Sequence, residues 1–292
     1  MKSGKVISKH YNEHNSKGHK KRNRTHKKRR LWLWGLTAVA FLLVLWGMAA
    51  EKSARYLPEY PKVSIEEYLY KEALSEEDYD LLFRQTGLAR PGVDALYREG
   101  RQEELLLLQE RLFAKIPIVC RANTILTREE RIAARTDAAL IPCIEEGDIL
   151  ITFNSHAFGW RNGHAAMVVD AKKQMTLEAQ VLGSDTAVVS MEHWTHYPSF
   201  AVLRLKNTSE QERKAIADKA REQMTGIPYH LTAGIWKENA GTQCAHLVWY
   251  AYHQFGYDLD SDGGLIVTPR DLYDSPLLEV IQIYGMPIVP EG

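Results

Sequence analysis

The sequence predicts an α+β protein, and three features of its 292 residues point to that class. Apolar residues recur at the helical period from about residue 63 to 140. From about residue 146 the period changes to two, which is typical of strands. Helical periodicity returns after Ser209, so strands and helices are segregated along the chain, with no large internal repeat. A content of 45% hydrophobic and 25% charged residues is that of a globular protein with a substantial core.

The first thirty residues form a basic tail. They hold twelve Lys or Arg and a single acid, Glu13, whereas the whole chain has 37 residues of each sign. The rest of the chain therefore keeps 25 basic and 36 acidic side chains and is acidic overall. A basic tail can bind nucleic acid or anionic lipid, and the segment that follows it decides between these partners.

The run LWLWGLTAVAFLLVLWGMAA, residues 31–50, contains no charge and is long enough to cross a bilayer as a helix. The positive-inside rule keeps residues 1–30 in the cytoplasm and sends residues 51–292 across the membrane. We therefore expect a single-pass anchor in the cell membrane, an extracytoplasmic domain and no nucleic-acid partner. A cleaved signal peptide is the alternative, because small residues at 47–50 resemble a cleavage site, although the apolar run exceeds a usual signal core.

Residues 51–145 are predicted to form a helical region. Four amphipathic segments follow one another, and the last is TREERIAARTDAAL. Ser75 and Thr127 stand at N-cap positions ahead of acidic first turns. The region shows no obvious chemistry, so we expect it to pack on the following domain or to space it from the membrane. The run LLLL at 105–108 is expected to be core.

Residues 146–292 are predicted to form an antiparallel sheet followed by helices. The strand candidates are short, rich in apolar and β-branched residues and separated by turn residues: DILITF, HAAMVVD, MTLEAQ, TAVVSM and SFAVLRL. Ser209 and Glu212 form a predicted capping box for a helix that runs to about Met224. The stretch TQCAHLVWYAY then predicts a helix with Cys244 in its first turn.

Cys244 is the candidate nucleophile of this domain. A thiol in the first turn of a helix lies near unpaired N–H groups and the positive end of the helix dipole, which favour the thiolate. A buried structural cysteine is the alternative. One arrangement of the three cysteines pairs Cys120 with Cys143 and leaves Cys244 free; in the other, all three are reduced.

A cysteine nucleophile needs a base, and the base needs a third group to orient it. His164 begins the strand HAAMVVD, and Glu178 lies in the next strand, MTLEAQ. A tight turn near 171–173 would place these two residues directly opposite each other, with Cβ atoms about 5 Å apart. The sequence therefore predicts a Cys-His-Glu triad, provided that the cysteine helix packs against this pair.

The ordered segments GDILITF, GHAAMVV, LEA and QCAHLVW resemble the circularly permuted papain-like hydrolases. These are the YaeF/YiiX-like relatives of NlpC-type cell-wall hydrolases and of lecithin:retinol acyltransferase. The resemblance covers about residues 146–280 and implies a permuted papain-like domain, with Cys244 as nucleophile, His164 as base and Glu178 as its orienting partner. The chain departs from the family where Ala245 and His246 replace the usual Ser and Glu or Gln, which leaves the substrate open.

Two further residues are candidates for the oxyanion hole. The backbone N–H of Cys244 would supply one donor, with Gln243 or Tyr229 assisting. His246 lies about 200° around the helix from Cys244, so we expect a structural or surface role for it.

Neither a metal nor another cofactor is expected. The segment DLDSDGG, with Asp258, Asp260 and Asp262, opens like a calcium loop, but Pro269 stands where the loop would need a bidentate Glu. No nucleotide fingerprint is present. The histidines outside the triad lack the spacing of a zinc site: His156, His193 and His196.

We predict a membrane-anchored, extracytoplasmic cysteine hydrolase of the amidase or peptidase type, acting on cell-wall peptides or related amide bonds. A lipid acyl hydrolase or acyltransferase is one alternative, and a catalytically silent binding domain is another. A thiol, an imidazole and a carboxylate kept together favour an enzyme. The fold by itself does not select the substrate.

Overall fold

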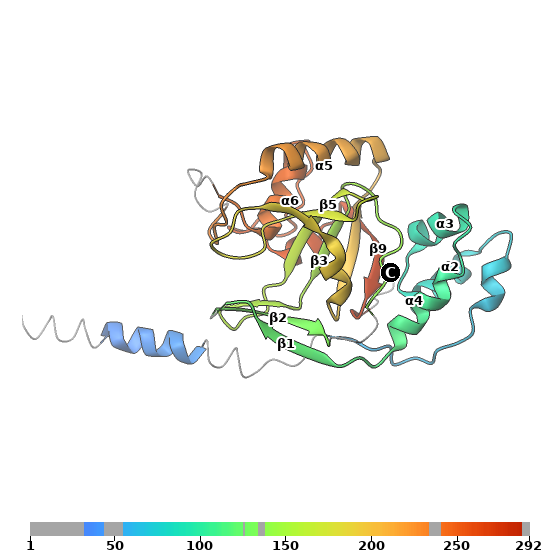
Figure 1. Cartoon of the computed structure of the whole chain (residues 1–292), viewed down its shortest axis with the longest axis horizontal. Helices are drawn as coiled ribbons and strands as arrows, with labels where there is room; N and C mark the ends of the chain where they lie inside the picture. Colours follow the sequence, from blue (N-terminus) through green and yellow to red (C-terminus); the bar gives the residue numbers. More distant parts are fainter. Residues whose placement is uncertain (1–31, 44–54, 125, 134–137, 234–240, 288–292) are drawn as a thin grey trace, which may run out of the picture. The chain divides into compact units, whose positions relative to one another are not determined.

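The computed structural model describes residues 32–43, 55–124, 126–133, 138–233 and 241–287 (Figure 1). The chain divides into two units, Met1–Glu51 and Lys52–Gly292. In the first unit, residues 32–43 form a helix. Within the residues described, no helix combines the length and the apolar character that a membrane crossing requires. The basic tail, residue 31 and residues 44–50 lie outside the described residues.

The second unit contains a six-stranded antiparallel sheet, and the α+β class is confirmed. Its strand order is β7-β6-β5-β3-β8-β9. The strands are β3 (Ile149–Thr152), β5 (His164–Asp170), β6 (Met175–Glu178), β7 (Ala187–Ser190), β8 (Phe200–Leu205) and β9 (Leu278–Tyr284). The first five match the predicted strands, whereas β9, at the edge, is an addition that the sequence pattern did not reveal.

Both faces of this sheet are covered. Helices α5 (Glu210–Met224) and α6 (Cys244–His253) pack on one face, where Ala165 and Met167 of β5 are buried (Figure 1). Ala166 and Val168 point to the other face, which is covered by residues of the 3-10 helix η2 (Met191–His196). The alternation along β5 therefore separates two cores, as the period of a strand requires.

The helix α5 follows the prediction with one difference. The Ser209 hydroxyl accepts a hydrogen bond from the Glu212 backbone at 3.2 Å, and the helix ends at Met224 as expected. The Glu212 carboxylate accepts instead from the Tyr257 hydroxyl at 2.6 Å. Only the hydroxyl half of the capping box is therefore formed, because a tertiary contact competes for the carboxylate.

The fourth predicted helix, TREERIAARTDAAL, is wrong. Thr127–Ile132 forms strand β2, which pairs with β1 (Ile118–Ala122) and with β4 (Ser155–Ala157) in a three-stranded sheet. Glu130 and Ile132 are buried two residues apart, the spacing of a strand. Pairing with two neighbours outweighs the local helical propensity, so Thr127 is a strand residue and no helix cap.

The helical region predicted for residues 51–145 is therefore shorter than expected. It comprises η1 (Glu66–Tyr70), α2 (Glu76–Thr86), α3 (Arg90–Arg98) and α4 (Glu104–Phe113). The Ser75 cap is confirmed, with a complete capping box to Asp78. Leu105 and Leu108 are core residues as expected, whereas Leu107 points outward and is 47% exposed.

Candidate active site

Cys244 is the first residue of α6, as the sequence predicts. The Gln243 side chain caps the helix, because its Oε1 accepts from the Ala245 backbone N–H at 2.9 Å. The Cys244 thiol lies 3.5 Å from the same oxygen and is only 8% exposed. The sulfur is thus held at the first turn of α6, at the positive end of the helix dipole.

The Cys244 thiol meets the ring of His164. Helix α6 packs against β5, of which His164 is the first residue. The two side chains are close enough for the Cys244 sulfur to act on the His164 ring and raise its pKa. The structure therefore brings the predicted nucleophile and the predicted base together, although 80 positions of sequence separate them.

Glu178 completes the group. Its Oε2 lies 2.7 Å from His164 Nε2, and its side chain is fully buried. All three residues of the predicted triad are thus joined in one chain of contacts, from thiol to imidazole to carboxylate.

The register that brings Glu178 to His164 differs from the prediction. Met167 pairs with Leu177, and one step further along this register Glu178 is level with Ala166, two residues from His164. A bulge near the end of β5 and a turn of four residues cause the displacement. Since Ala166 and His164 share a face of the sheet, the Glu178 side chain still reaches the ring on the diagonal.

The Glu178 carboxylate is fixed by neighbours that the sequence analysis missed. Its Oε1 accepts from Thr176 Oγ1 at 2.5 Å and from Trp194 Nε1 at 2.9 Å, and it lies 3.2 Å from His193 Nε2. The Trp194 ring also stacks on His164, with centroids 5.5 Å apart. Thr176 has a sequence signal, because it lies two positions before Glu178 on the same face; Trp194 and His193 have none.

These contacts control the charges of the site. Burial would raise the pKa of Glu178, but the hydrogen bond with His164 and the nearby imidazole of His193 outweigh it and hold that pKa well below the ordinary 4.5. Burial opposes the charge of His164, yet the Cys244 sulfur and the hydrogen bond with Glu178 raise its pKa to about 10. The site therefore favours an imidazolium at His164, between the Glu178 carboxylate and the Cys244 sulfur.

The other two cysteines have different surroundings. All three cysteines are free, so Cys120 and Cys143 are not paired. Cys120 is exposed on β1, whereas Cys143 is partly buried, with its sulfur 3.4 Å from the Gly92 carbonyl oxygen. Burial raises the pKa of Cys143 to about 12, which makes it a poor nucleophile near neutral pH.

The two candidates for the oxyanion hole are placed differently. Gln243 Nε2 donates to the Val267 carbonyl at 2.6 Å while its Oε1 caps α6, so both ends of the amide are engaged. Tyr229 is half-buried, and burial together with the nearby Cys244 raises the pKa of its hydroxyl. That hydroxyl remains a proton donor close to the sulfur, so Tyr229 is the better placed of the two.

His246 faces away from this group. Its Nδ1 lies 2.9 Å from the Thr242 hydroxyl, and its ring stacks on Tyr250. Burial lowers its pKa, which keeps the ring neutral. These contacts agree with the structural role expected from its position on the helix.

The candidate triad lies beside a large cavity. The cavity has a volume of about 1260 Å³, and Cys244, His164 and Tyr229 contribute to its wall. The remaining wall comes from the β1–β2 turn, the segment after β3, and the loops that follow β6, α5 and α6. A substrate in this cavity would reach both the sulfur and the imidazole.

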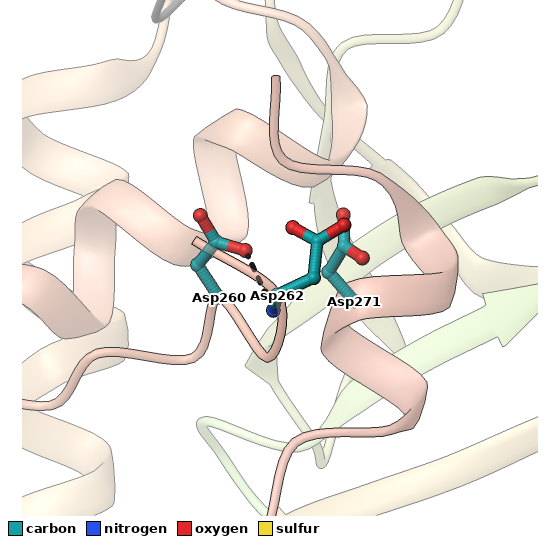
Figure 2. A group of neighbouring side chains, drawn as sticks. All are labelled: Asp260, Asp262 and Asp271. Atoms are coloured by element: carbon teal, nitrogen blue, oxygen red, sulfur yellow. Dashed lines mark hydrogen bonds between the residues drawn. The ribbon is translucent and has the colours of Figure 1, made fainter. Parts of the chain in front are cut away.

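Figure 2 shows a group of three carboxylates near helix α7 (Pro269–Tyr273). The ligand atoms of Asp260, Asp262 and Asp271 lie within 4.8 Å of one another, and no other such group of three occurs in the described segments. Each carboxylate accepts a backbone N–H: Asp260 from residue 262 at 3.4 Å, Asp262 from residue 264 at 2.7 Å and Asp271 from residue 268 at 2.7 Å. A tight turn and a helix cap account for this arrangement.

The three histidines outside the triad, considered above for a zinc site, each contact different residues. His193 lies beside Glu178, and His156 Nε2 lies 3.3 Å from a Glu130 carboxylate oxygen. His196 is bonded to the Glu192 backbone of its own helix at 3.2 Å. Each histidine therefore has a separate set of contacts.

Comparison with known proteins gives one structural neighbour. No protein-family model matches the sequence, and no curated protein matches it. The chain is similar to the crystal structure of metalloprotein yiiX from Escherichia coli O157:H7, with 17% sequence identity and a TM-score of 0.40. The similarity covers 49% of this chain and 98% of that one.

Proposed function

We propose that the chain is a cysteine hydrolase of the permuted papain-like kind, which cleaves an amide or ester bond at its carbonyl carbon. One observation carries this proposal: Cys244, His164 and Glu178 form a continuous chain of contacts beside a cavity. A binding domain has no need of a nucleophile, a base and an orienting carboxylate in that order.

The first half of the proposed reaction forms a thioester. The Cys244 thiolate attacks the carbonyl carbon, a C–S bond forms, and the π electron pair moves to the carbonyl oxygen. The backbone N–H of Cys244 and the Tyr229 hydroxyl would stabilise that oxyanion. The pair then returns, the bond to the leaving nitrogen or oxygen breaks, and the His164 imidazolium gives its proton to the leaving group.

The second half returns the enzyme to its first state. Neutral His164 takes a proton from water while the water oxygen attacks the thioester carbon. The C–S bond breaks, the carboxylic acid leaves, and the Cys244 thiolate is again paired with the imidazolium. Glu178 keeps the imidazole oriented and stabilises its charge throughout. If an alcohol or amine replaced water, the same steps would transfer the acyl group.

The proposal includes a location. Residues 31–50 would anchor the chain in the cell membrane, with residues 1–30 in the cytoplasm and residues 146–292 as the catalytic domain outside. In that place, cell-wall peptides and lipid acyl groups are both within reach. The silent binding domain remains the competing function.

Selective alkylation tests the proposal. Iodoacetamide near neutral pH should label Cys244 at least about tenfold faster than Cys120, because the paired thiolate is the reactive form. Cys120 is the fair reference, since burial already slows Cys143. His164→Ala should remove most of the advantage by removing the ion-pair partner. Equal labelling of Cys244 and Cys120 in the wild type would favour the silent domain.

A further inference from the structure

We propose that strand β2 completes the proposed active site: its Arg131 and Glu129 are positioning residues that hold η2 in place and, through η2, the Glu178 carboxylate. This inference rests on the proposed function and extends the site into residues 51–145, a region whose sequence showed no obvious chemistry. Three observations support it: the contacts between β2 and η2, the contacts between η2 and the triad, and the charge of Glu129 in the cavity wall.

Strand β2 is joined to η2 through the side chains of one of its faces. Glu129 and Arg131 are two positions apart and therefore share a face of the strand. Arg131 Nη1 donates to the backbone carbonyl of His193 at 2.6 Å, and its guanidinium carbon lies 3.7 Å from the centroid of the Tyr197 ring. The Tyr197 hydroxyl donates to Glu129 Oε1 at 2.9 Å. The two side chains of β2 therefore hold both η2 and the residue that follows it.

Arg131 and Glu129 also fix each other. Arg131 Nε and Nη2 both donate to Glu129 Oε2, at 3.0 and 2.6 Å. Only 16% of the Arg131 side chain and 17% of the Glu129 side chain are exposed. Charge-assisted bonds of this kind are short and directional. The guanidinium is thus held in one orientation, with its remaining nitrogen aimed at the η2 carbonyl.

The helix η2 carries two of the side chains that surround Glu178. Trp194 Nε1 donates to Glu178 Oε1 at 2.9 Å, and the Trp194 ring stacks on His164. His193, whose carbonyl binds Arg131, places its Nε2 3.2 Å from the same carboxylate oxygen. A short 3-10 helix has poorer internal hydrogen bonds than an α-helix, so its tertiary contacts decide where it lies. A shift of η2 would therefore move the neighbours that fix Glu178.

Glu129 acts on the site by its charge as well. It lines the same cavity as His164 and Cys244. Burial opposes its ionisation, but Arg131 and His164 lower its pKa below the ordinary 4.5. The attraction between Glu129 and an imidazolium is mutual, whereas the same charge repels a thiolate, and Arg131 offsets part of it. The other titratable groups that act on the triad come from separate elements: His193, Tyr197 and Tyr229.

The pH dependence of Cys244 alkylation tests this inference on the full chain in detergent micelles. Iodoacetamide reacts with the thiolate, so labelling slows as the thiolate is protonated. The measured quantity is the pH at which Cys244 reaches half of its maximal rate, which we term the acid midpoint. Cys143 reports on folding, because its partly buried thiol should label slowly unless the protein opens.

Substitution of Arg131 should raise the acid midpoint. Arg131→Met removes the charge and the bond to η2, so the thiolate loses a nearby cation and a firmly held imidazolium. The midpoint should rise by about one pH unit, which slows labelling roughly tenfold below it. Arg131→Lys keeps a cation that can bond to the same carbonyl, and it should restore about half of this shift, because a lysine lacks the fork of donors.

Substitution of Glu129 should move the midpoint the other way. Glu129→Gln keeps an acceptor for the Tyr197 hydroxyl, so η2 stays anchored while one negative charge is lost. The acid midpoint should fall by about half a pH unit, because less repulsion opposes the thiolate. A general loss of stability would not shift the two variants in opposite directions.

Arg90→Met is the matched control. Arg90 also pairs with a carboxylate, that of Glu76 at 2.6 Å, and its guanidinium carbon lies 4.6 Å from the centroid of a tyrosine ring, that of Tyr79. Neither Arg90 nor these two partners line the cavity, and they belong to α3 and α2. The acid midpoint should stay within about 0.2 pH unit of the wild type, because solvent screens a distant charge.

The outcomes separate the inference from the proposed function. Opposite shifts in Arg131→Met and Glu129→Gln, absent in Arg90→Met, would support it. Unchanged midpoints with Cys143 still slow, shifts in the same direction, or an equal shift in Arg90→Met would overturn it. If Arg131→Met exposes Cys143, Arg131→Lys and Glu129→Gln decide by the same criteria. A wild-type Cys244 that labels no faster than Cys120 would instead reject the proposed hydrolase.

Discussion

Two buried charge clusters of the same sheet have similar contacts but different surroundings. At one, Glu178 holds His164 at 2.7 Å. At the other, Asp148 and Arg204 form two parallel hydrogen bonds of 2.7 and 2.8 Å. Both carboxylates are fully buried, and each accepts further hydrogen bonds. Asp148 accepts from the Glu145 backbone N–H, and Glu178 accepts from the Thr176 hydroxyl and from Trp194 Nε1.

Access to the cavity separates the two clusters. The Asp148–Arg204 pair continues through Glu145 to Arg213, away from the cavity wall. The Glu178 cluster ends at His164 and Cys244, which form part of that wall. Burial and pairing alone are therefore no sign of function, since structural ion pairs show them too. The informative feature is a chain of contacts that ends, on the wall of a cavity, at the proposed nucleophile.

The largest expected effect is at Cys244, the proposed nucleophile. Cys244→Ser should lower hydrolysis of a p-nitrophenyl ester on the order of 10⁴-fold, about 5.5 kcal/mol of transition-state stabilisation, because the serine hydroxyl is not ionised by this imidazole. The midpoint of urea unfolding should change little. Cys120→Ser is the control and should keep full activity; equal rates in the two variants would place the chemistry elsewhere.

A substitution in the Asp148–Arg204 cluster should lower the stability of the fold but leave the reactivity of Cys244 unchanged. Asp148→Ala leaves the buried Arg204 without its main partner and should lower the free energy of unfolding by about 3–5 kcal/mol. Alkylation of Cys244 in the folded protein should stay within about twofold of the wild type.

A double variant tests whether the unpaired charge of Arg204 causes this loss of stability. Asp148→Leu combined with Arg204→Met should recover most of the lost stability, because no unpaired charge remains. A large fall in Cys244 reactivity with little loss of stability would show that the two clusters are coupled and would end the distinction between them.

The smallest expected effect is a dependence on pH at Glu178. The folded pKa of Glu178 is depressed below 4.5, so its stabilisation is present above about pH 4.5 and is lost as the pH falls through the folded value. Glu178→Gln should therefore cost about 1–3 kcal/mol of unfolding free energy at pH 6 and less at pH 3. Urea unfolding at the two pH values measures this difference. A cost that does not change with pH would mean that the carboxylate is not held ionised by His164 and His193.

Local pattern accounts for much of the domain. Apolar periodicity and capping residues predicted the strand His164–Asp170, the end of α5 at Met224 and the start of α6 at Cys244. Thr127–Ile132 shows the limit of such patterns. Its local sequence is compatible with a helix, but in the folded protein it pairs with β1 and β4 and forms a strand. Glu178 shows another limit: the bulge in β5 and the four-residue turn shifted its register by two residues, and it still faces His164 because a shift of two keeps a residue on the same face of the sheet.

The sequence by itself determined the residue types of the candidate site, their order and the elements that carry them, because these depend on spacing along the chain. The tertiary structure alone decided three things: that α6 meets β5, that Trp194 and His193 complete the Glu178 cluster, and that five loops surround one cavity. Each of these joins segments separated by fourteen or more positions. Contacts of that kind depend on how elements pack, and no local periodicity encodes them.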